Sequence, residues 1–281
     1  MKIGILLPYK ENFSPEYPGA VSLFVYETTK KSKYKKEIIV FGNTNFKKKF
    51  KIKYKNINLT RQLLGSQTKN YVNKFIGLQN KYKFTIIEVH NRPSYIKQLS
   101  KKSPNSIYSL YFHNDPLSMD GSKTIEERKG LLKICYKIIF NSNWSKKRFL
   151  EGLENKFVNS NKLAVFFQSA KKGHISNIIK KKNWITFVGK LNRAKGYDVF
   201  VKSIQKILRK YPNWRAKIIG DEKREKINLK HKNADLLGFL NHDEVLKVFK
   251  NSSIAVACSR WEEPFGRTSL EASANGCAVI I

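Results

Sequence analysis

The chain has 281 residues, of which 41% are hydrophobic, so it is long enough for about two domains and too apolar to be disordered overall. Its formal charge of +34 suggests an anionic partner, but lysine outnumbers arginine 45 to 10 and is spread over every segment, whereas a base-reading surface favours arginine. We therefore expect no nucleic-acid partner. The densest lysine runs, 30–36 and 47–55, are interpreted as solvated faces, with contact with an anionic membrane as the alternative.

Membrane helices and leader sequences are not expected. No apolar run approaches the roughly 18 residues that a membrane helix needs, and the apolar run 3–7 directly follows Met1-Lys2 in place of a signal peptide. This predicts a cytoplasmic protein, with peripheral contact at the inner face of the membrane as an extension. Cys135, Cys258 and Cys277 are odd in number, lack metal-ligand spacing and lie among apolar residues, so we expect buried free thiols.

Short apolar runs alternate with helical patterns from end to end, which predicts an α/β fold with parallel sheets. The first half forms one complete doubly wound unit, which we assign to residues 1–170. Helices such as 20–30 and 144–153 separate its strands. The predicted strands are 2–8, 37–41, 84–89, 106–112, 138–141 and 163–167.

A second series of strands begins after the polar, lysine-rich stretch 168–183, and we assign it to a domain at 171–281. Its predicted strands are 184–189, 216–220, 234–237, 254–257 and 278–281. A doubly wound sheet usually has about six strands, each with a covering helix. We therefore expect the second domain to be truncated at the C-terminus, as in a fragment, with 278–281 as a central strand that lacks its helix.

Glycines recur at the ends of consecutive strands in the second series. Gly189 and Gly220 end two of them, and Leu237 precedes a third glycine. Ligands of open α/β sheets bind at this carboxyl edge, so the recurrence favours a nucleotide there, although each glycine alone fits an ordinary turn. Lys190 and Lys195 follow Gly189 and are placed to meet a diphosphate, with solvated surface lysines as the alternative.

The segment 261–272, Trp-Glu-Glu-Pro-Phe-Gly-Arg-Thr-Ser-Leu-Glu-Ala, is the most informative part of the chain. Pro264 cannot lie inside a helix and Gly266 permits close backbone approach, so Glu263 is expected in a loop and Glu271 in the helix that follows. Their shared target is then a ligand held over the helix N-terminus, which attracts phosphate. A capped surface helix with a solvated acid is the alternative.

Taken together, these motifs resemble the C-terminal domain of family 4 retaining glycosyltransferases, which have two facing Rossmann-like domains (the GT-B fold). The resemblance covers about residues 184–281 and includes two glutamates separated by seven residues. It implies that Glu263 touches the donor sugar and Glu271 the ribose. It also implies that the amides of Phe265, Gly266 and Arg267 bind the diphosphate together with Lys190 and Lys195, where the family usually has arginine in place of Lys190.

The N-terminal half carries a looser resemblance. Gly19-Ala20 is similar to the family's glycine loop under the donor, which more often has two glycines, and His113 stands where the family has a histidine that faces the reacting sugar. His90 also ends a predicted strand and is interpreted as structural. The remaining histidines, His174, His231 and His242, are expected to lie in exposed loops.

The resemblance implies a glycosyltransferase that moves a sugar from a nucleotide sugar, held between the domains, to an acceptor hydroxyl with retention of configuration. Glu263, His113 and Lys195 are its expected catalytic residues. No metal or other cofactor is expected, because lysines and a helix N-terminus stabilise the leaving diphosphate. The expected acceptor is a glycan or lipid-linked glycan of cell-surface polysaccharide or lipopolysaccharide synthesis.

Two other interpretations of the residues stay open. Glu263 and Glu271 are the types of residue that serve as acid and nucleophile in a glycosidase, although the lysines and the glycine edge then have no role. A basic module that binds nucleic acid or a membrane without catalysis is the other, although aromatic residues are not interleaved with lysine as base stacking requires.

Overall fold

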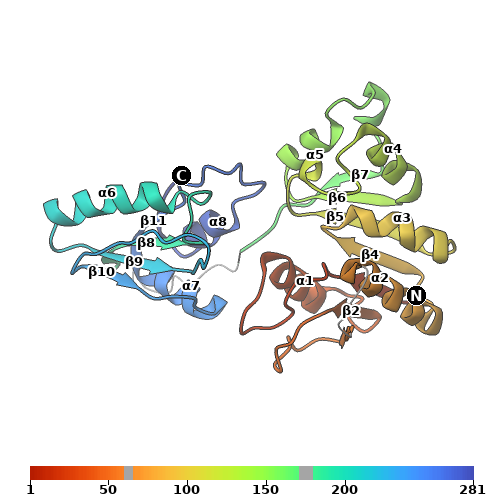
Figure 1. The fold of residues 1–281 in the computed structure, drawn as a ribbon, viewed down its shortest axis with the longest axis horizontal. Coiled ribbons are helices and arrows are strands. Elements are labelled where there is room, and N and C mark those ends of the chain that lie inside the picture. Colours follow the sequence, from red (N-terminus) through yellow and green to blue (C-terminus); the bar gives the residue numbers. More distant parts are fainter. Residues whose placement is uncertain (60–65, 171–179) are drawn as a thin grey trace. The chain divides into compact units, whose positions relative to one another are not determined.

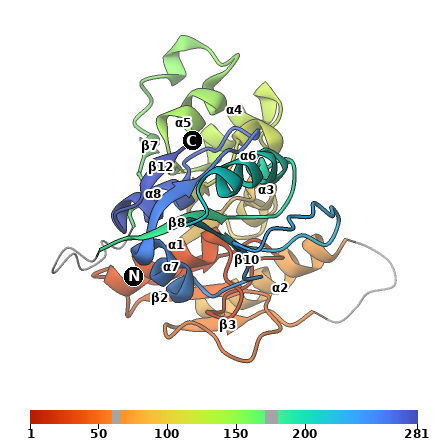
Figure 2. The ribbon, with the colours of Figure 1, turned by 90° about the vertical axis from the view of Figure 1, so that its left-hand side faces the viewer.

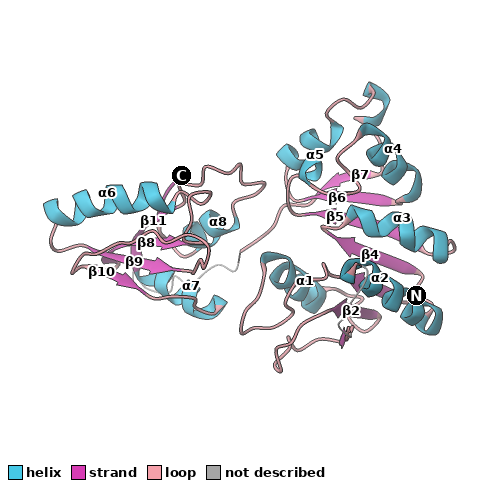
Figure 3. Cartoon of the chain, in the orientation of Figure 1, coloured by secondary structure: helices cyan, strands magenta, loops and turns pink. Residues whose placement is uncertain are grey.

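A computed structural model describes residues 1–59, 66–170 and 180–281, and divides the chain into two compact units, Met1–Gln168 and Ser169–Ile281 (Figure 1). The predicted domain boundary, at 170/171, falls two residues later than this division, and residue 171 itself lies outside the described residues, as does His174. Helices and parallel strands alternate along both units (Figure 3). The predicted α/β class is confirmed.

The first unit is built on a seven-stranded sheet with the order β3-β2-β1-β4-β5-β6-β7, in which every described pair is parallel. Buried aromatic and branched residues on both faces of this sheet form its core, which suits a parallel sheet covered by helices on both sides. The strands are β1 (Ile3–Leu6), β2 (Ile38–Gly42), β3 (Tyr54–Asn56), β4 (Ile86–His90), β5 (Ile107–Phe112), β6 (Lys137–Phe140) and β7 (Leu163–Val165). The helices are α1 (Ala20–Lys31), α2 (Gln67–Tyr82), α3 (Pro93–Lys102), α4 (Ile125–Ile134) and α5 (Asn143–Leu150), with short 3₁₀ turns η1 (Pro116–Ser118) and η2 (Asn155–Phe157).

Strand β3 was not predicted, because it lies at the end of the lysine run 47–55 that was interpreted as a solvated face. It pairs with β2 at the edge of the sheet (Figure 2). The run also holds the buried Phe50, and Tyr54 stacks on Phe13 with ring centroids 4.9 Å apart. Aromatic packing therefore attaches this basic segment to the core, while its lysines remain at the surface.

The second unit has a five-stranded parallel sheet with the order β10-β9-β8-β11-β12. Helix α6 lies on one face of the sheet and α7 on the other (Figure 1). Within the described residues β12 pairs only with β11 and is therefore an edge strand, so the prediction of a central strand at 278–281 was wrong. The elements are β8 (Lys182–Val188), α6 (Tyr197–Lys210), β9 (Arg215–Ile219), β10 (Ala234–Leu236), α7 (His242–Asn251), β11 (Ser252–Val256), α8 (Arg267–Ala274) and β12 (Ala278–Ile280).

Both sheets reverse their strand order once. In the first sheet the reversal lies between β1 and β4, and in the second it lies between β8 and β11. Loops that leave adjacent strands on opposite sides of such a point diverge and open a crevice at the carboxyl edge, where open α/β sheets bind ligands. In the second sheet, the loops that border such a crevice are those that follow β8 and β11.

Among the described residues, none of the helices combines the length and the apolar character that crossing a membrane requires.

Candidate functional site

The loops after β8 and β11 are joined by a close backbone contact. Gly196 has a positive φ of 69°, and a Cβ atom on it would lie 1.8 Å from the carbonyl oxygen of Cys258. The Cys258 thiol in turn donates to the Gly196 carbonyl oxygen at 3.2 Å. Only glycine fits at this position, and the contact brings Lys195 next to the segment that carries Glu263.

Lys195 and Glu263 form an ion pair between these two loops, from Nζ to Oε1. The Ser259 hydroxyl donates to the same Oε1 at 2.9 Å. Both charged side chains are about one-third exposed, at 33% and 36%. A pair so accessible to water contributes little to stability and exchanges readily for a ligand. Lys195 was predicted from the sequence to bind a phosphate, and its contact with Glu263 was not predicted.

Replacing Gly196 by alanine is expected to lower the free energy of unfolding by about 3 kcal/mol, since the new methyl group meets the Cys258 carbonyl and the backbone stays left-handed. Gly77, in the exposed middle of α2, serves as the control, because a Cβ atom on it would meet no other atom within 4 Å. Its alanine variant is expected to be neutral or stabilised by up to about 1 kcal/mol. Chemical denaturation measures both, and equal values would contradict the proposed contact.

The glycines at the strand ends lie in main-chain segments that are hydrogen-bonded to one another along the carboxyl edge of the sheet. Gly189 N donates to Ile219 O at 3.0 Å, and Gly220 N donates to Gly238 O at 2.8 Å. A Cβ atom on Gly220 would lie 1.8 Å from Gly189 O, so the close packing of these two main-chain segments requires this glycine. Leu237 N donates to Ile218 O at 2.8 Å, and its side chain packs against the core. The predicted residues at this edge are therefore brought together, with Lys190 exposed beside them.

Helix α8 begins at Arg267, and its N-cap is Gly266, whose positive φ of 74° places it in the left-handed region. Phe265 is half-buried, and the first turn of the helix has no side-chain cap from Gly266. The main-chain N–H groups that the sequence assigned to a diphosphate therefore stand at the start of α8 as expected. The helix is only eight residues long, so attraction of a diphosphate to its N-terminus depends on the neighbouring charges as well.

Glu271 is buried at 7% exposure and is held by the side chains of Arg267 and His242. Its Oε1 accepts hydrogen bonds from Arg267 Nε at 2.7 Å and from His242 Nε2 at 2.9 Å. Burial raises the pKa of the Glu271 carboxyl, but the His242 hydrogen bond and the Arg267 charge outweigh it and hold the pKa below its usual range. The prediction of an exposed loop position for His242 was wrong, because this residue opens α7 and faces Glu271.

In the first unit, Gly19 caps α1 and lies against a carboxylate. Glu11 Oε1 accepts from the main-chain N–H of Ser22 at 2.8 Å, and a Cβ on Gly19 would lie 2.1 Å from that oxygen. Burial raises the Glu11 pKa above its usual value. The start of α1 is thus occupied by the chain's own carboxyl group, which an anionic ligand at Gly19 has to displace or meet in its protonated form.

His113 is the middle of a buried chain of hydrogen bonds. Its Nε2 lies 2.9 Å from His90 Nδ1, and His90 Nε2 lies 2.6 Å from Glu88 Oε1. Its Nδ1 accepts from the Gln168 amide at 3.3 Å. If Glu88 is ionised, it accepts the proton on His90 Nε2, so His90 Nδ1 accepts from His113 Nε2. His90, interpreted as structural from the sequence, is therefore the direct partner of His113.

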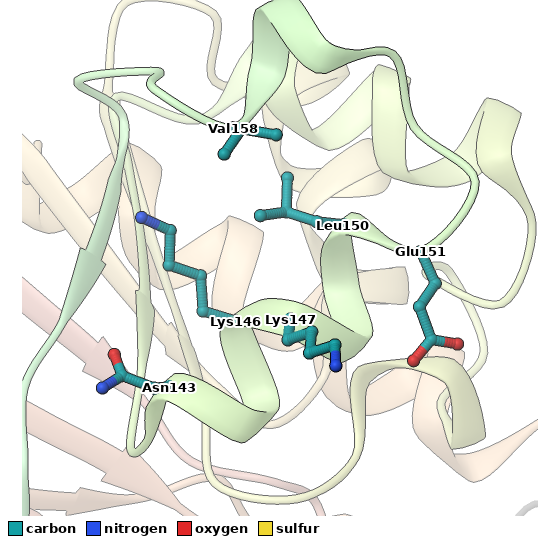
Figure 4. Close-up of a pocket in the computed structure, with 6 residues that line it drawn as sticks. All are labelled: Asn143, Lys146, Lys147, Leu150, Glu151 and Val158. Carbon is teal, nitrogen blue, oxygen red and sulfur yellow. The ribbon is translucent and has the colours of Figure 1, made fainter.

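A cavity of about 410 Å³ lies along α5 (Figure 4). Lys146, Leu150 and Val158 point into the same open space in this view. It contains none of the predicted site residues. Among the described residues, no cluster of three or more His, Cys, Asp or Glu side chains has the arrangement of a metal site, and metal independence stays a prediction.

The second unit corresponds to a known family model. Residues 169–281 match the model described as "Glycosyl transferases group 1". Spore coat protein SA of Bacillus subtilis is 25% identical over 232 residues, which are 71% of this chain and 60% of that protein. The "Uncharacterized glycosyltransferase MJ1607" of Methanocaldococcus jannaschii is 33% identical over 105 residues, 34% of this chain and 26% of that protein. The chain thus spans 60% or less of the length of these relatives.

Solved structures are similar over nearly the whole chain. The crystal structure of Anabaena HepE in complex with UDP and glucose matches 99% of this chain and 80% of its own, with a TM-score of 0.73 and 17% identity. The apo form of the lipopolysaccharide outer core galactosyltransferase WaaB matches 99% and 80%, with a TM-score of 0.62 and 16% identity. At these identities the likeness establishes the fold. The chain therefore has the GT-B fold of two Rossmann-like domains, and its second unit matches the group 1 glycosyltransferase model.

Proposed function

We propose that the protein is a family 4 retaining glycosyltransferase that transfers a sugar from a nucleotide sugar to an acceptor hydroxyl. One observation carries the proposal. At the strand-order reversal of the second sheet, the loops after β8 and β11 bring Lys195 and Glu263 into contact, and α8 starts four residues beyond Glu263. Cations, a carboxylate and the main-chain N–H groups at the start of α8 suit a sugar diphosphate.

In the proposed reaction, the bond between the anomeric carbon and the diphosphate breaks, while the acceptor oxygen bonds to the same carbon with its configuration kept. Negative charge grows on the leaving diphosphate, where Lys190, Lys195 and the N–H groups of Phe265, Gly266 and Arg267 stabilise it. Glu263 contacts the sugar hydroxyls and the positive charge that develops on the ring. Release of Lys195 from Glu263 by the phosphate makes both groups available at once.

Glu271 and its neighbours are assigned to the ribose. Arg267 and His242 both donate to Oε1 of Glu271, which fixes the orientation of the carboxylate plane. The depressed pKa keeps the group ionised at neutral pH, as an acceptor for two hydroxyls requires. The lysines supply the positive charge, so we propose that the reaction needs no metal and no other cofactor.

In the first unit, we assign His113 to the reacting sugar and Gly19 to the donor loop, with Glu88 and His90 positioning the His113 ring. The acceptor is a glycan or lipid-linked glycan, and we place the reaction in the cytoplasm, at the inner membrane face where the acceptor is lipid-linked. Cell-surface polysaccharide or lipopolysaccharide synthesis is the proposed setting, which the likeness to WaaB supports.

The experiment that tests the proposal is thermal shift with nucleoside diphosphates and nucleotide sugars, starting with UDP and UDP-glucose because the similar HepE structures contain them. A ligand at 100 times its Kd stabilises the protein by about 2.7 kcal/mol. Magnesium is left out of one series and added to the other. A stabilising nucleotide that needs no magnesium supports the proposal, and failure of every nucleotide would contradict it.

A further inference from the structure

Gln168, the last residue of the first unit, has a buried side chain although its neighbours along the chain are exposed. Its exposed fraction is 9%, whereas Phe166 and Phe167 are 57% and 59% exposed, and Ser169 is exposed as well. The hydrophobic effect favours the reverse order, and burying an amide without a hydrogen bond costs free energy. A specific polar contact therefore holds Gln168 inside the unit.

That contact is with His113. Gln168 Nε2 lies 3.3 Å from His113 Nδ1. An amide nitrogen donates and does not accept, so Nδ1 is the acceptor and a neutral His113 carries its ring proton on Nε2. This Nε2 lies 2.9 Å from His90 Nδ1, and His90 Nε2 lies 2.6 Å from Glu88 Oε1. With Glu88 ionised, all three hydrogen bonds donate in one direction, from Gln168 toward the carboxylate.

The rest of His113 is fixed by the core of the first unit. Its ring stacks on Tyr111 of β5, with ring centroids 4.9 Å apart. Asn91 Oδ1 accepts from its main-chain N–H at 3.0 Å, and Asn141 Nδ2 donates to its carbonyl oxygen at 2.8 Å. These two asparagines directly follow β4 and β6, whereas Gln168 lies three residues beyond the end of β7. Nδ1 is thus the ring nitrogen whose partner can change without disturbing the central strands.

The hydrogen bond from Gln168 is also the longest in the chain of hydrogen bonds that leads to Glu88, at 3.3 Å against 2.9 and 2.6 Å. A longer hydrogen bond is a weaker one. A sugar hydroxyl can supply the same donor to His113 Nδ1, because each hydroxyl both donates and accepts. A fixed acceptor with a weakly bound donor therefore suits exchange with a ligand hydroxyl.

We propose that Gln168 is a positioning residue that occupies the place of a donor-sugar hydroxyl at His113 Nδ1 and leaves when the sugar binds. This exchange rests on the proposed transferase function, whereas the tautomer of His113 rests on its hydrogen bonds with Gln168 and His90. The amide keeps Nδ1 unprotonated before the sugar arrives, so the histidine meets the sugar as an acceptor. Because the Gln168 contact is lost on sugar binding, it lowers the affinity for a nucleotide sugar and leaves that for the nucleoside diphosphate unchanged.

The test compares nucleoside diphosphates with their nucleotide sugars on the full chain, by isothermal titration with UDP, UDP-glucose, GDP and GDP-mannose. Gln168→Ala removes the amide, and water, which is displaced at little cost, takes its place. The variant is expected to bind a nucleotide sugar about fivefold more tightly than the wild-type chain and the matching diphosphate equally well. Ser169→Ala, at the next and exposed position, is the control and is expected to match the wild-type chain with all four ligands.

Two further measurements show whether the effect passes through His113. On a His113→Ala background, Gln168→Ala is expected to leave nucleotide-sugar affinity unchanged, because no ring nitrogen remains for the amide to hold. Imidazole ¹⁵N NMR of the chain without nucleotide is expected to show His113 protonated on Nε2 and unprotonated on Nδ1. The Nδ1 signal is expected to shift in Gln168→Ala and on addition of the nucleotide sugar, and to stay in place on addition of the diphosphate.

The outcomes separate the exchange from the transferase function. Nucleotide-sugar affinity that is unchanged or weaker in Gln168→Ala, an equal gain for the diphosphate, or the same gain on the His113→Ala background would overturn the exchange while leaving diphosphate binding as evidence for the transferase. A proton on His113 Nδ1 in the chain without nucleotide would overturn it without reference to any ligand. Failure of all four nucleotides to bind would contradict the transferase and the exchange together.

Discussion

Replacing Glu271 by alanine is expected to weaken nucleoside diphosphate binding by at least about tenfold and to lower the free energy of unfolding by about 3 kcal/mol. The carboxylate is buried and accepts hydrogen bonds from both Arg267 and His242, so its removal leaves two donors without it in a dry site. Isothermal titration with UDP measures the affinity, and chemical denaturation measures the stability. Ser273→Ala, at an exposed position on the same helix, is the control.

Glu271→Gln separates the effect on nucleotide affinity from the effect on stability, because glutamine keeps the volume of the side chain and removes its charge. A carboxyl whose pKa is depressed in the folded state contributes stability above its usual pKa of 4.5, and this contribution is lost as the pH falls through the lower, folded value. The wild-type chain is therefore expected to lose stability more steeply than Glu271→Gln below pH 4.5. Unchanged UDP affinity in both variants would reject the ribose assignment.

The apolar strands could be predicted from the sequence because each consists of a continuous run of residues that are buried in the core. The segments 2–8 and 184–189 are recognisable as strands since their runs of branched and aromatic residues are enough to fill a parallel sheet. β3 could not be predicted, because it has three residues and its stability comes from pairing with β2 and from Phe13, which stands 41 positions before Tyr54. Such distant packing leaves no local pattern.

The candidate site was predictable where it depends on backbone geometry. Glycines at strand ends and Pro264 before α8 have local physical reasons, so the sequence located Gly220, Gly266 and Glu263 in loops at one edge. The side-chain partners were not predictable. His242 and Glu271 are 29 positions apart, and Lys195 and Glu263 are 68 apart, so only the order of strands in the sheet brings them into contact.

For the histidine pair of the first unit, too, the positions were predictable from the sequence and the contact between the side chains was not. His90 and His113 were visible as strand-end histidines, but their hydrogen bond depends on β4 and β5 being neighbours with His90 beside Tyr111 in the register. One available signal was the repeated pattern of a histidine followed by an asparagine at both strand ends. Asn91 Oδ1 accepts from the main-chain N–H of His113 at 3.0 Å, which ties the two ends together.

Replacing Glu263 by alanine is expected to lower turnover about 100-fold, which corresponds to about 2.7 kcal/mol of transition-state stabilisation, with nucleoside diphosphate affinity changed less than about threefold. Glu263 is one-third exposed and its ion pair with Lys195 adds little to stability, so the fold is expected to lose less than about 1 kcal/mol. Without Glu263 the Lys195 ammonium is free for phosphate, which preserves binding of the leaving group while the contact with the sugar is lost.

Glu262→Ala is the matched control for this change, because Glu262 is the exposed neighbouring acid and forms no hydrogen bond or ion pair with any residue in the described part of the chain. It removes the same charge and is expected to keep full turnover, so a purely electrostatic effect of net charge on the donor would appear equally in both variants. Initial rates at saturating donor, together with UDP titrations, distinguish the two roles. If Glu263→Ala weakened UDP binding as strongly as Glu271→Ala, the two carboxylates would share one function, because a group that contacts only the transferred sugar has no interaction to lose when the sugar is absent.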